Sequence, residues 1–113
     1  MTTERLLLLL RQQESEHLEF KEAKFALPTS LFETICAMLN GDGGDIILGV
    51  NDFGNVTGID VDQVDKMMND LANLSNDPAK INPTFLLFPR KCQVDEKWLI
   101  HLYVPASSQV HKL

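Results

Sequence analysis

Apolar residues recur at helical spacing in three stretches of the chain. Residues 3–13 place leucines on one face, after a threonine that can cap a helix. Residues 31–39 follow a capping-box pattern, in which Glu33 stands three positions after Ser30. A third stretch begins after Asp60 and is ended by Pro78. We therefore predict three helices, and the second and third present apolar faces that can pack on a sheet.

The remaining apolar residues follow the patterns of strands. Residues 14–23 alternate between charged and apolar positions, which is typical of a half-buried strand. Residues 46–50 form a short apolar run bounded by glycine turns, and this pattern predicts a strand covered on both faces. A turn over residues 51–55 leads to a returning strand at 56–59. Residues 84–94 and 97–104 predict a long hairpin, whose second strand has one apolar and one mixed face.

The predicted order is helix, strand, helix, strand, strand, helix, strand, strand. This order is typical of an α+β fold, in which two helices cover one face of a mixed β-sheet and the N-terminal helix is additional. The chain has 113 residues and no linker-like or repeated segment, so we treat residues 1–113 as a single domain. We expect this domain to be the N-terminal part of a longer protein.

Charge and composition restrict the classes of function. The net charge is −6, so a protein that binds phosphates would need a local basic patch, an oligomer or parts outside this chain. The leucine run at residues 6–10 is too short to span a bilayer, and we expect a cytoplasmic protein without a membrane partner. Cys36 and Cys92 have no metal-ligand spacing, which favours reduced core residues.

The glycine-rich stretch GDGGDIILGV at residues 41–50 resembles a phosphate-binding loop only superficially. It contains neither GxxxxGK[ST] nor GxGxxG, and it precedes a strand, whereas such loops follow a strand and open a helix. The aspartates of the nearby turns also lack the spacing of a calcium loop. The glycines are therefore interpreted as turn residues.

Three carboxylates could converge at one end of the predicted sheet: Glu14, Glu19 and Asp52. Such a group can bind a hard cation that polarises a phosphodiester and activates water. The alternative is that Glu19 pairs with Lys21 on a solvated face, Asp52 supports its turn, and Glu14 caps the preceding helix. The spacing of the residues favours this structural alternative.

Four cationic residues are candidates for phosphate contacts: Lys21, Lys24, Arg90 and Lys91. Surface lysines and arginines are more often solubilising than functional. The three histidines have no metal-ligand spacing. We expect no cofactor apart from Mg²⁺ or Mn²⁺, which would be needed only if the carboxylates form a catalytic site.

Two linked motifs resemble a known family. They are ESEHLEFKEA at residues 14–23, and the helix end ICAMLN followed by GDGGDIILGVNDFGNVTGI up to residue 59. Together they resemble the Alba-like domain of Schlafen-type proteins, found at the N-terminus of bacterial transcriptional regulators and helicase-related proteins. The resemblance covers residues 14–104. It implies an α+β fold, a DNA-binding module and downstream C-terminal domains in the same protein.

The resemblance also implies a second function. In the animal Schlafen branch, a similar domain forms a metal-dependent RNA-cleaving site from three acidic residues, which match Glu14, Glu19 and Asp52 here. The leading hypothesis is nevertheless a nucleic-acid-binding domain of a bacterial transcriptional regulator that binds DNA or RNA and could form a homodimer. The alternatives are a divalent-metal-dependent endoribonuclease and a module for oligomerisation or protein contact.

Overall fold

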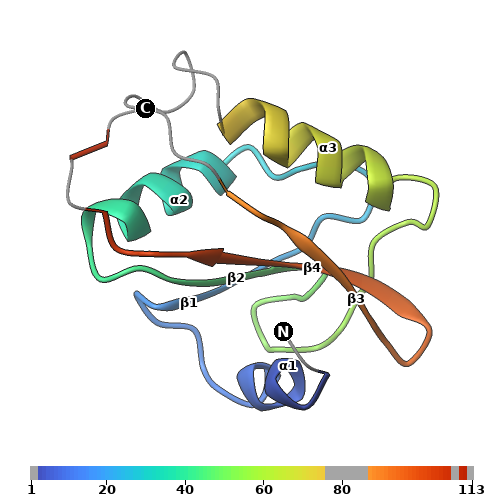
Figure 1. The fold of residues 1–113 in the computed structure, drawn as a ribbon. Helices are drawn as coiled ribbons and strands as arrows, with labels where there is room; N and C mark the ends of the chain where they lie inside the picture. Colours follow the sequence, from blue (N-terminus) through green and yellow to red (C-terminus); the bar gives the residue numbers. More distant parts are fainter. Residues whose placement is uncertain (1–2, 76–86, 108–109, 112–113) are drawn as a thin grey trace.

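The computed structural model describes residues 3–75, 87–107 and 110–111 of the chain. Three helices and four strands are formed within these residues (Figure 1). In chain order they are α1 (Thr3–Leu10), β1 (Leu18–Lys21), α2 (Leu31–Asn40), β2 (Gly44–Leu48), α3 (Val64–Ser75), β3 (Arg90–Val94) and β4 (Lys97–Val104). The predicted end of the third helix at Pro78 and the first residues of the predicted strand at 84–94 lie outside the described residues.

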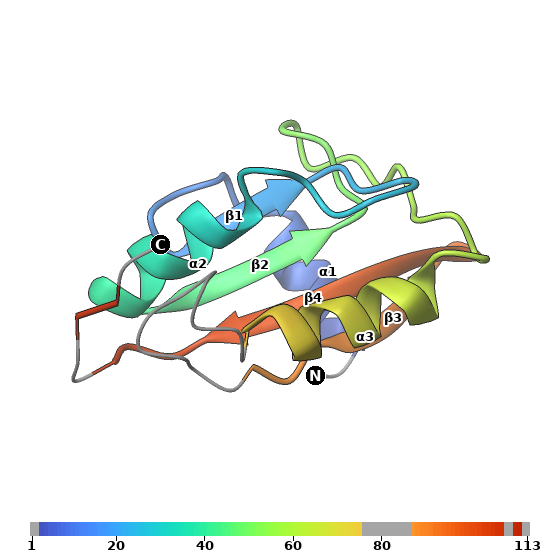
Figure 2. The same ribbon diagram turned by 90° about the horizontal axis from the view of Figure 1, so that it is seen from above.

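The four strands form one mixed sheet in the order β1-β2-β4-β3. β1 runs parallel to β2, while β2 pairs antiparallel with β4, and β4 pairs antiparallel with β3. β2 and β4 are therefore the inner strands, and β1 and β3 are the two edges (Figure 2). The predicted α+β class with a mixed sheet is confirmed.

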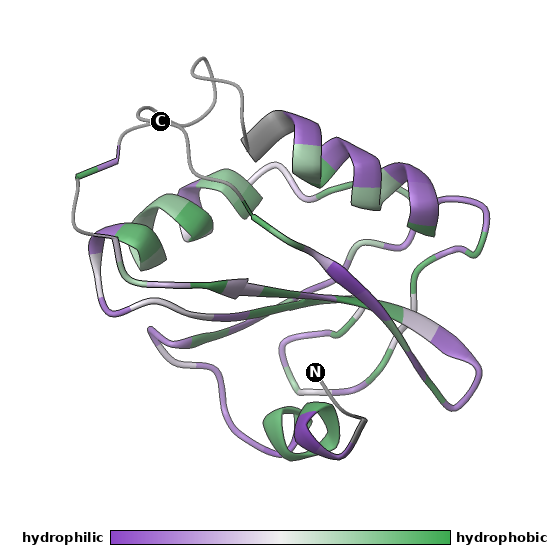
Figure 3. Ribbon diagram, in the orientation of Figure 1, coloured by the Kyte–Doolittle hydropathy of each residue, from purple (hydrophilic) through white to green (hydrophobic). Residues whose placement is uncertain are grey.

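Helices cover both faces of the sheet, as Figure 1 shows. α2 and α3 lie on one face, where Ile46 and Leu48 of β2 join the larger apolar core. α1 lies on the other face, where its Leu6 packs in a second core with Ile47. Adjacent strand residues point to opposite faces, so the apolar run of β2 is buried on both sides. Figure 3 shows β2 as largely hydrophobic, whereas hydrophilic and hydrophobic residues alternate along α3.

Of the predicted strand segments, one is absent from the structure and another is shorter than expected. Residues 56–59 do not form a strand, and only the isolated bridges Val50–Val56 and Ile59–Trp98 remain there. Gly58 lies between them with a φ of +83°, which is outside the strand region and interrupts a continuous ladder. The strand expected at residues 14–23 is reduced to β1, because Glu14 and its neighbours form a connection before it.

The predicted capping box of α2 is wrong. Ser30 occupies the cap position, but its side chain makes no capping hydrogen bond. The Ser30 hydroxyl instead accepts a hydrogen bond from Nζ of Lys21 at 2.9 Å. A tertiary contact with β1 has therefore replaced the local interaction that the sequence suggested.

Two glycines at the start of β2 allow close backbone packing. Gly43 has a φ of +78°, and a Cβ atom there would lie 2.4 Å from the carbonyl oxygen of Val104. Gly44 is already in the strand, and a Cβ atom there would lie 2.6 Å from the carbonyl oxygen of His17. These distances are too short for a side chain, so the pair brings β2 into contact with the chain on both sides.

Asn40 at the end of α2 holds the segment that follows β4. Its side-chain amide donates to the carbonyl oxygen of His111 at 2.8 Å, and its Oδ1 accepts from the backbone N of His111 at 2.7 Å. The buried Cys36 thiol also donates to this carbonyl. Both cysteines are free thiols. None of the helices in the described part of the chain is long and apolar enough to cross a membrane.

Candidate functional site

Glu14 and Asp52 line one surface pocket of about 400 Å³ beside the end of α1. Oε1 of Glu14 accepts a hydrogen bond from the backbone N of Phe20 at 3.3 Å, which ties the connection after α1 to β1. Asp52 belongs to the turn after β2. In this turn it is Oδ1 of Asn51 that accepts two backbone hydrogen bonds, each of 3.0 Å. The turn is therefore supported by Asn51, and the side chain of Asp52 is exposed beside it.

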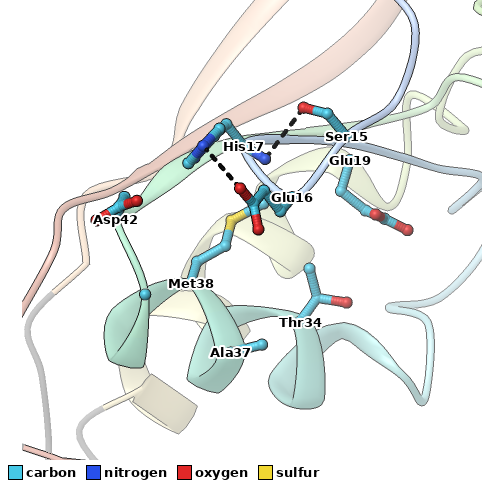
Figure 4. Close-up of a pocket in the computed structure, with 9 residues that line it drawn as sticks. Ser15, Glu16, His17, Glu19, Thr34, Ala37, Met38 and Asp42 are labelled. Carbon is cyan, nitrogen blue, oxygen red and sulfur yellow. Dashed lines mark hydrogen bonds and ion pairs between the residues drawn. The ribbon is translucent and has the colours of Figure 1, made fainter.

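Glu19 lies on the opposite face of β1 from the buried Phe20. It lines a second pocket of about 350 Å³, between the connection at residues 15–17 and helix α2 (Figure 4). Its carboxylate lies 3.7 Å from Nζ of Lys21, so the pairing named in the structural alternative is present, but the Lys21 side chain is largely covered rather than solvated. His17 is seen in the same pocket, 3.4 Å from Glu16.

The three carboxylates nevertheless interact electrostatically. Partial burial raises the pKa of Glu14 above its ordinary value, and the charge of Glu19 raises it further. The hydrogen bond from Phe20 opposes this increase, the charge of Asp52 adds to it, and Lys21 lowers the pKa again. The pKa of Glu14 is therefore affected by the charges of both Glu19 and Asp52.

The arrangement does not provide a ready metal site. Within residues 3–75, 87–107 and 110–111, no three His, Cys, Asp or Glu side chains are grouped closely enough to hold one ion. Glu19 lines a different pocket from the other two carboxylates. The geometry as it stands does not fit a bound Mg²⁺ or Mn²⁺. The metal-binding and catalytic roles of these residues stay predictions.

The four predicted cationic residues do not form one patch. Lys21 is on edge strand β1, where its side chain is 11% exposed and bound to Ser30. Nζ of Lys24 lies 5.6 Å from the ring centre of Phe25, in the connection after β1. Arg90 and Lys91 are on β3, the opposite edge of the sheet. Any phosphate contact by these residues would therefore involve two separate regions.

Arg90 and Lys91 also point to different faces. Nζ of Lys91 lies 3.0 Å from Asp65 of α3 and 5.5 Å from the ring centre of Trp98, so it belongs to the α3 side. Arg90 lines a hollow on the α1 side together with Arg5 of α1. This hollow has a volume of about 290 Å³.

A polar pair at this hollow was not expected from the sequence. Nε2 of His101 lies 2.7 Å from Oδ1 of Asp45, and the two side chains are only 7% and 13% exposed. Asp45 on β2 is paired with Tyr103 in the register of β4, so His101 is its diagonal neighbour. The alternation of residues 97–104 predicted a mixed face carrying His101 and Tyr103. That Asp45 is the partner of His101 follows only from the register between β2 and β4.

The fold and its surface define a small α+β domain with a mixed sheet, and comparisons identify its family. The family model described as Schlafen, AlbA_2 matches residues 14–113. The chain therefore belongs to the Schlafen AlbA_2 family, and the resemblance inferred from the two motifs is confirmed.

Two solved structures are similar to the chain. The N-terminal domain of a protein from Nitrosomonas europaea, whose name relates it to the ATP-dependent DNA helicase RecG, is 31% identical with a TM-score of 0.68. The match covers 92% of this chain and 72% of that one. The DIP2311 protein from Corynebacterium diphtheriae is 16% identical with a TM-score of 0.61, which supports the fold alone. That match covers 96% of this chain and 22% of the other. None of the curated proteins compared with the chain matches it.

Proposed function

We propose that this chain is a nucleic-acid-binding domain. The observation that carries the proposal is the family match over residues 14–113, together with the similarity to the N-terminal domain of a RecG-related protein. Because the net charge is −6, binding by this domain itself would use a local surface rather than the whole molecule. Such a surface would include Arg90 of β3 and Arg5 of α1, which line the same hollow.

The test is equilibrium binding of the purified protein to fluorescein-labelled DNA and RNA, followed by fluorescence anisotropy over a range of salt concentrations. Each phosphate contact releases condensed counterions, so the logarithm of the association constant should fall linearly with the logarithm of the salt concentration. Absence of binding to either nucleic acid at low ionic strength would refute the proposal.

A finer proposal is that the domain serves a bacterial transcriptional regulator, as its N-terminal part. It is supported by the similarity to an N-terminal domain of a bacterial protein. Occupancy of DNA in cells, measured by chromatin immunoprecipitation of the intact protein, should then be enriched at promoters. Uniform occupancy, or none, would contradict this role while leaving nucleic-acid binding itself untouched.

A divalent-metal-dependent ribonuclease is the second candidate. The observation in its favour is the raised pKa of Glu14, which results partly from the charges of Glu19 and Asp52. A bound cation would supply Lewis-acid activation of a phosphodiester and offset the mutual repulsion of the carboxylates. In the structure the three side chains do not close around one ion.

This second candidate is tested by incubating structured RNA with the protein in Mg²⁺ or Mn²⁺. The wild type is compared with Asp52→Ala and with Asp62→Ala, which removes another exposed aspartate from a different turn. Cleavage that is lost in Asp52→Ala and kept in Asp62→Ala would support the assignment. Equal cleavage by all three proteins would exclude this site.

A further inference from the structure

The hollow on the α1 side of the sheet combines aromatic and guanidinium groups. Its lining consists of Arg5, Asp45, Phe88, Arg90, His101 and Tyr103. It lies where α1 approaches the β3 edge, and the residues come from α1, the three strands β2, β4 and β3, and the segment just before β3. Elements far apart in the sequence therefore build one surface. Of the residues that line the hollow, only Arg90 was among the site residues predicted from the sequence.

Two aromatic rings are presented to solvent at this hollow. Tyr103 is 55% exposed and Phe88 is 70% exposed, although large apolar side chains are more often covered. The adjacent Leu87 and Leu102 are buried in the core on the α2 and α3 side, so strand alternation directs Tyr103 to the α1 side. An exposed aromatic ring offers a flat face on which an unpaired nucleobase can stack.

The charged groups at the hollow favour an anionic ligand. Arg5 and Arg90 reach it from α1 and from β3. A guanidinium group binds phosphate oxygens through paired donors. The one acidic residue, Asp45, is 13% exposed and lies 2.7 Å from His101. Its carboxylate is thus largely covered, and the open surface is formed mainly by the rings and the arginines.

We propose that this hollow binds single-stranded nucleic acid, with an unpaired base stacked against Tyr103 and Phe88 and flanking phosphates bound by Arg5 and Arg90. The inference rests on the proposed nucleic-acid-binding function and adds the class of ligand. In a duplex the faces of the bases are covered by their neighbours, so exposed rings can stack only on bases that are unpaired. The volume of about 290 Å³ is near the lower end of small-ligand sites, which suits a single base.

The test compares labelled single strands of roughly 12 nucleotides with the matching duplexes, a length within the site sizes of single-strand-binding folds. The double variant Phe88→Ala/Tyr103→Ala should bind the single strand about tenfold or more weakly, because each stacked base contributes about that much. Tyr103→Phe keeps the ring and should bind as the wild type does. Phe25→Ala removes another exposed ring, next to Lys24 and away from this hollow, and should leave the affinity unchanged.

The arginines provide a second readout. Arg90→Ala should reduce the slope of log association constant against log salt by about 0.7, the value for one single-strand phosphate contact. Lys66→Ala, a charge removal on α3, should not change the slope. Circular dichroism of each variant checks that the fold is kept.

The outcomes separate the two proposals. If the wild type binds neither single strands nor duplexes, the proposed function fails. If the wild type binds nucleic acid but the folded double variant matches Phe25→Ala, only the hollow is excluded. A wild type that prefers duplex, with no loss in the double variant, would likewise overturn the single-strand inference.

Discussion

Breaking the buried Asp45–His101 pair should measurably destabilise the sheet. The two side chains lie 2.7 Å apart between neighbouring strands β2 and β4 and are almost completely covered. Asp45→Ala would leave the His101 side chain, which is only 7% exposed, without this partner. His101→Ala would do the same to Asp45. Each change therefore removes one hydrogen bond and leaves one buried polar group unsatisfied.

The size of the effect follows from the burial. An unsatisfied buried donor or acceptor costs about 1–3 kcal/mol, so each single substitution should lower the free energy of unfolding by about 2 kcal/mol. Domains of this size have free energies of unfolding of about 5–15 kcal/mol, so both variants should still fold. The double variant should lose less than the sum, because its second change removes a group that is already unpaired. We expect a coupling free energy of about 1–2 kcal/mol.

Urea unfolding followed by circular dichroism measures these differences. With a slope of roughly 1–3 kcal/mol per molar urea, the midpoint of each single variant should fall by roughly 1 M. The control is Asp70→Ala, which breaks the exposed ion pair between Lys66 and Asp70 and should cost less than about 0.5 kcal/mol. If Asp45→Ala costs no more than Asp70→Ala, or if the double variant is strictly additive, the pair is not the buried contact described here.

Three further changes test the fold and the acidic site. Gly43→Ala should lower the free energy of unfolding by more than about 2 kcal/mol, because its positive φ alone costs an L-residue about 1–2 kcal/mol and the new Cβ meets a backbone oxygen at 2.4 Å. Gly41→Ala, at a negative φ and with a nearest contact of 3.2 Å to the carbonyl oxygen of Ala37, should cost less in the same urea assay, and equal losses would contradict the explanation. Asn40→Ala should lower the thermal midpoint, since it removes two hydrogen bonds to the backbone of His111 that are worth about 0.5–1.5 kcal/mol each. The pKa of Glu14 is raised in the folded protein, so the folded state binds the proton of Glu14 more tightly than the unfolded chain does. The contribution of Glu14 to stability should therefore fall as the pH rises from 4.5 through the raised pKa. Glu14→Gln should therefore gain stability relative to the wild type over this pH range, and parallel stability profiles would contradict the electrostatic explanation.

Much of the fold could be predicted because burial leaves a clear pattern in the sequence. The run at residues 46–50 predicted a strand covered on both faces, and β2 has that environment between α1 and the pair α2 and α3. The end of α2 and the hairpin strand β4 were also predicted to within a residue. Residues 56–59 were misassigned because the positive φ of Gly58 leaves only isolated bridges there, and the pattern of apolar residues does not reveal this backbone conformation.

Less of the site could be predicted, because it depends on the sheet register. Glu14, Glu19 and Asp52 are close enough to interact, but strand alternation places Glu19 on the opposite face from the pocket of the other two. Asp45 and His101 are 56 positions apart, and only the antiparallel pairing of β2 with β4 makes them diagonal neighbours. A sequence pattern can place such residues on a face without showing which of them meet.

The most direct test of the account is to locate the bound nucleic acid on the protein. A titration of the ¹⁵N-labelled chain with an unlabelled single-stranded oligonucleotide, followed by ¹H–¹⁵N correlation spectra, reports the environment of each backbone amide. We expect the largest shift changes around Phe88, Arg90 and Tyr103, with smaller changes along α3. Shift changes confined to α2 and α3, or spectra that do not change at low salt, would contradict the assignment of this face as the nucleic-acid interface.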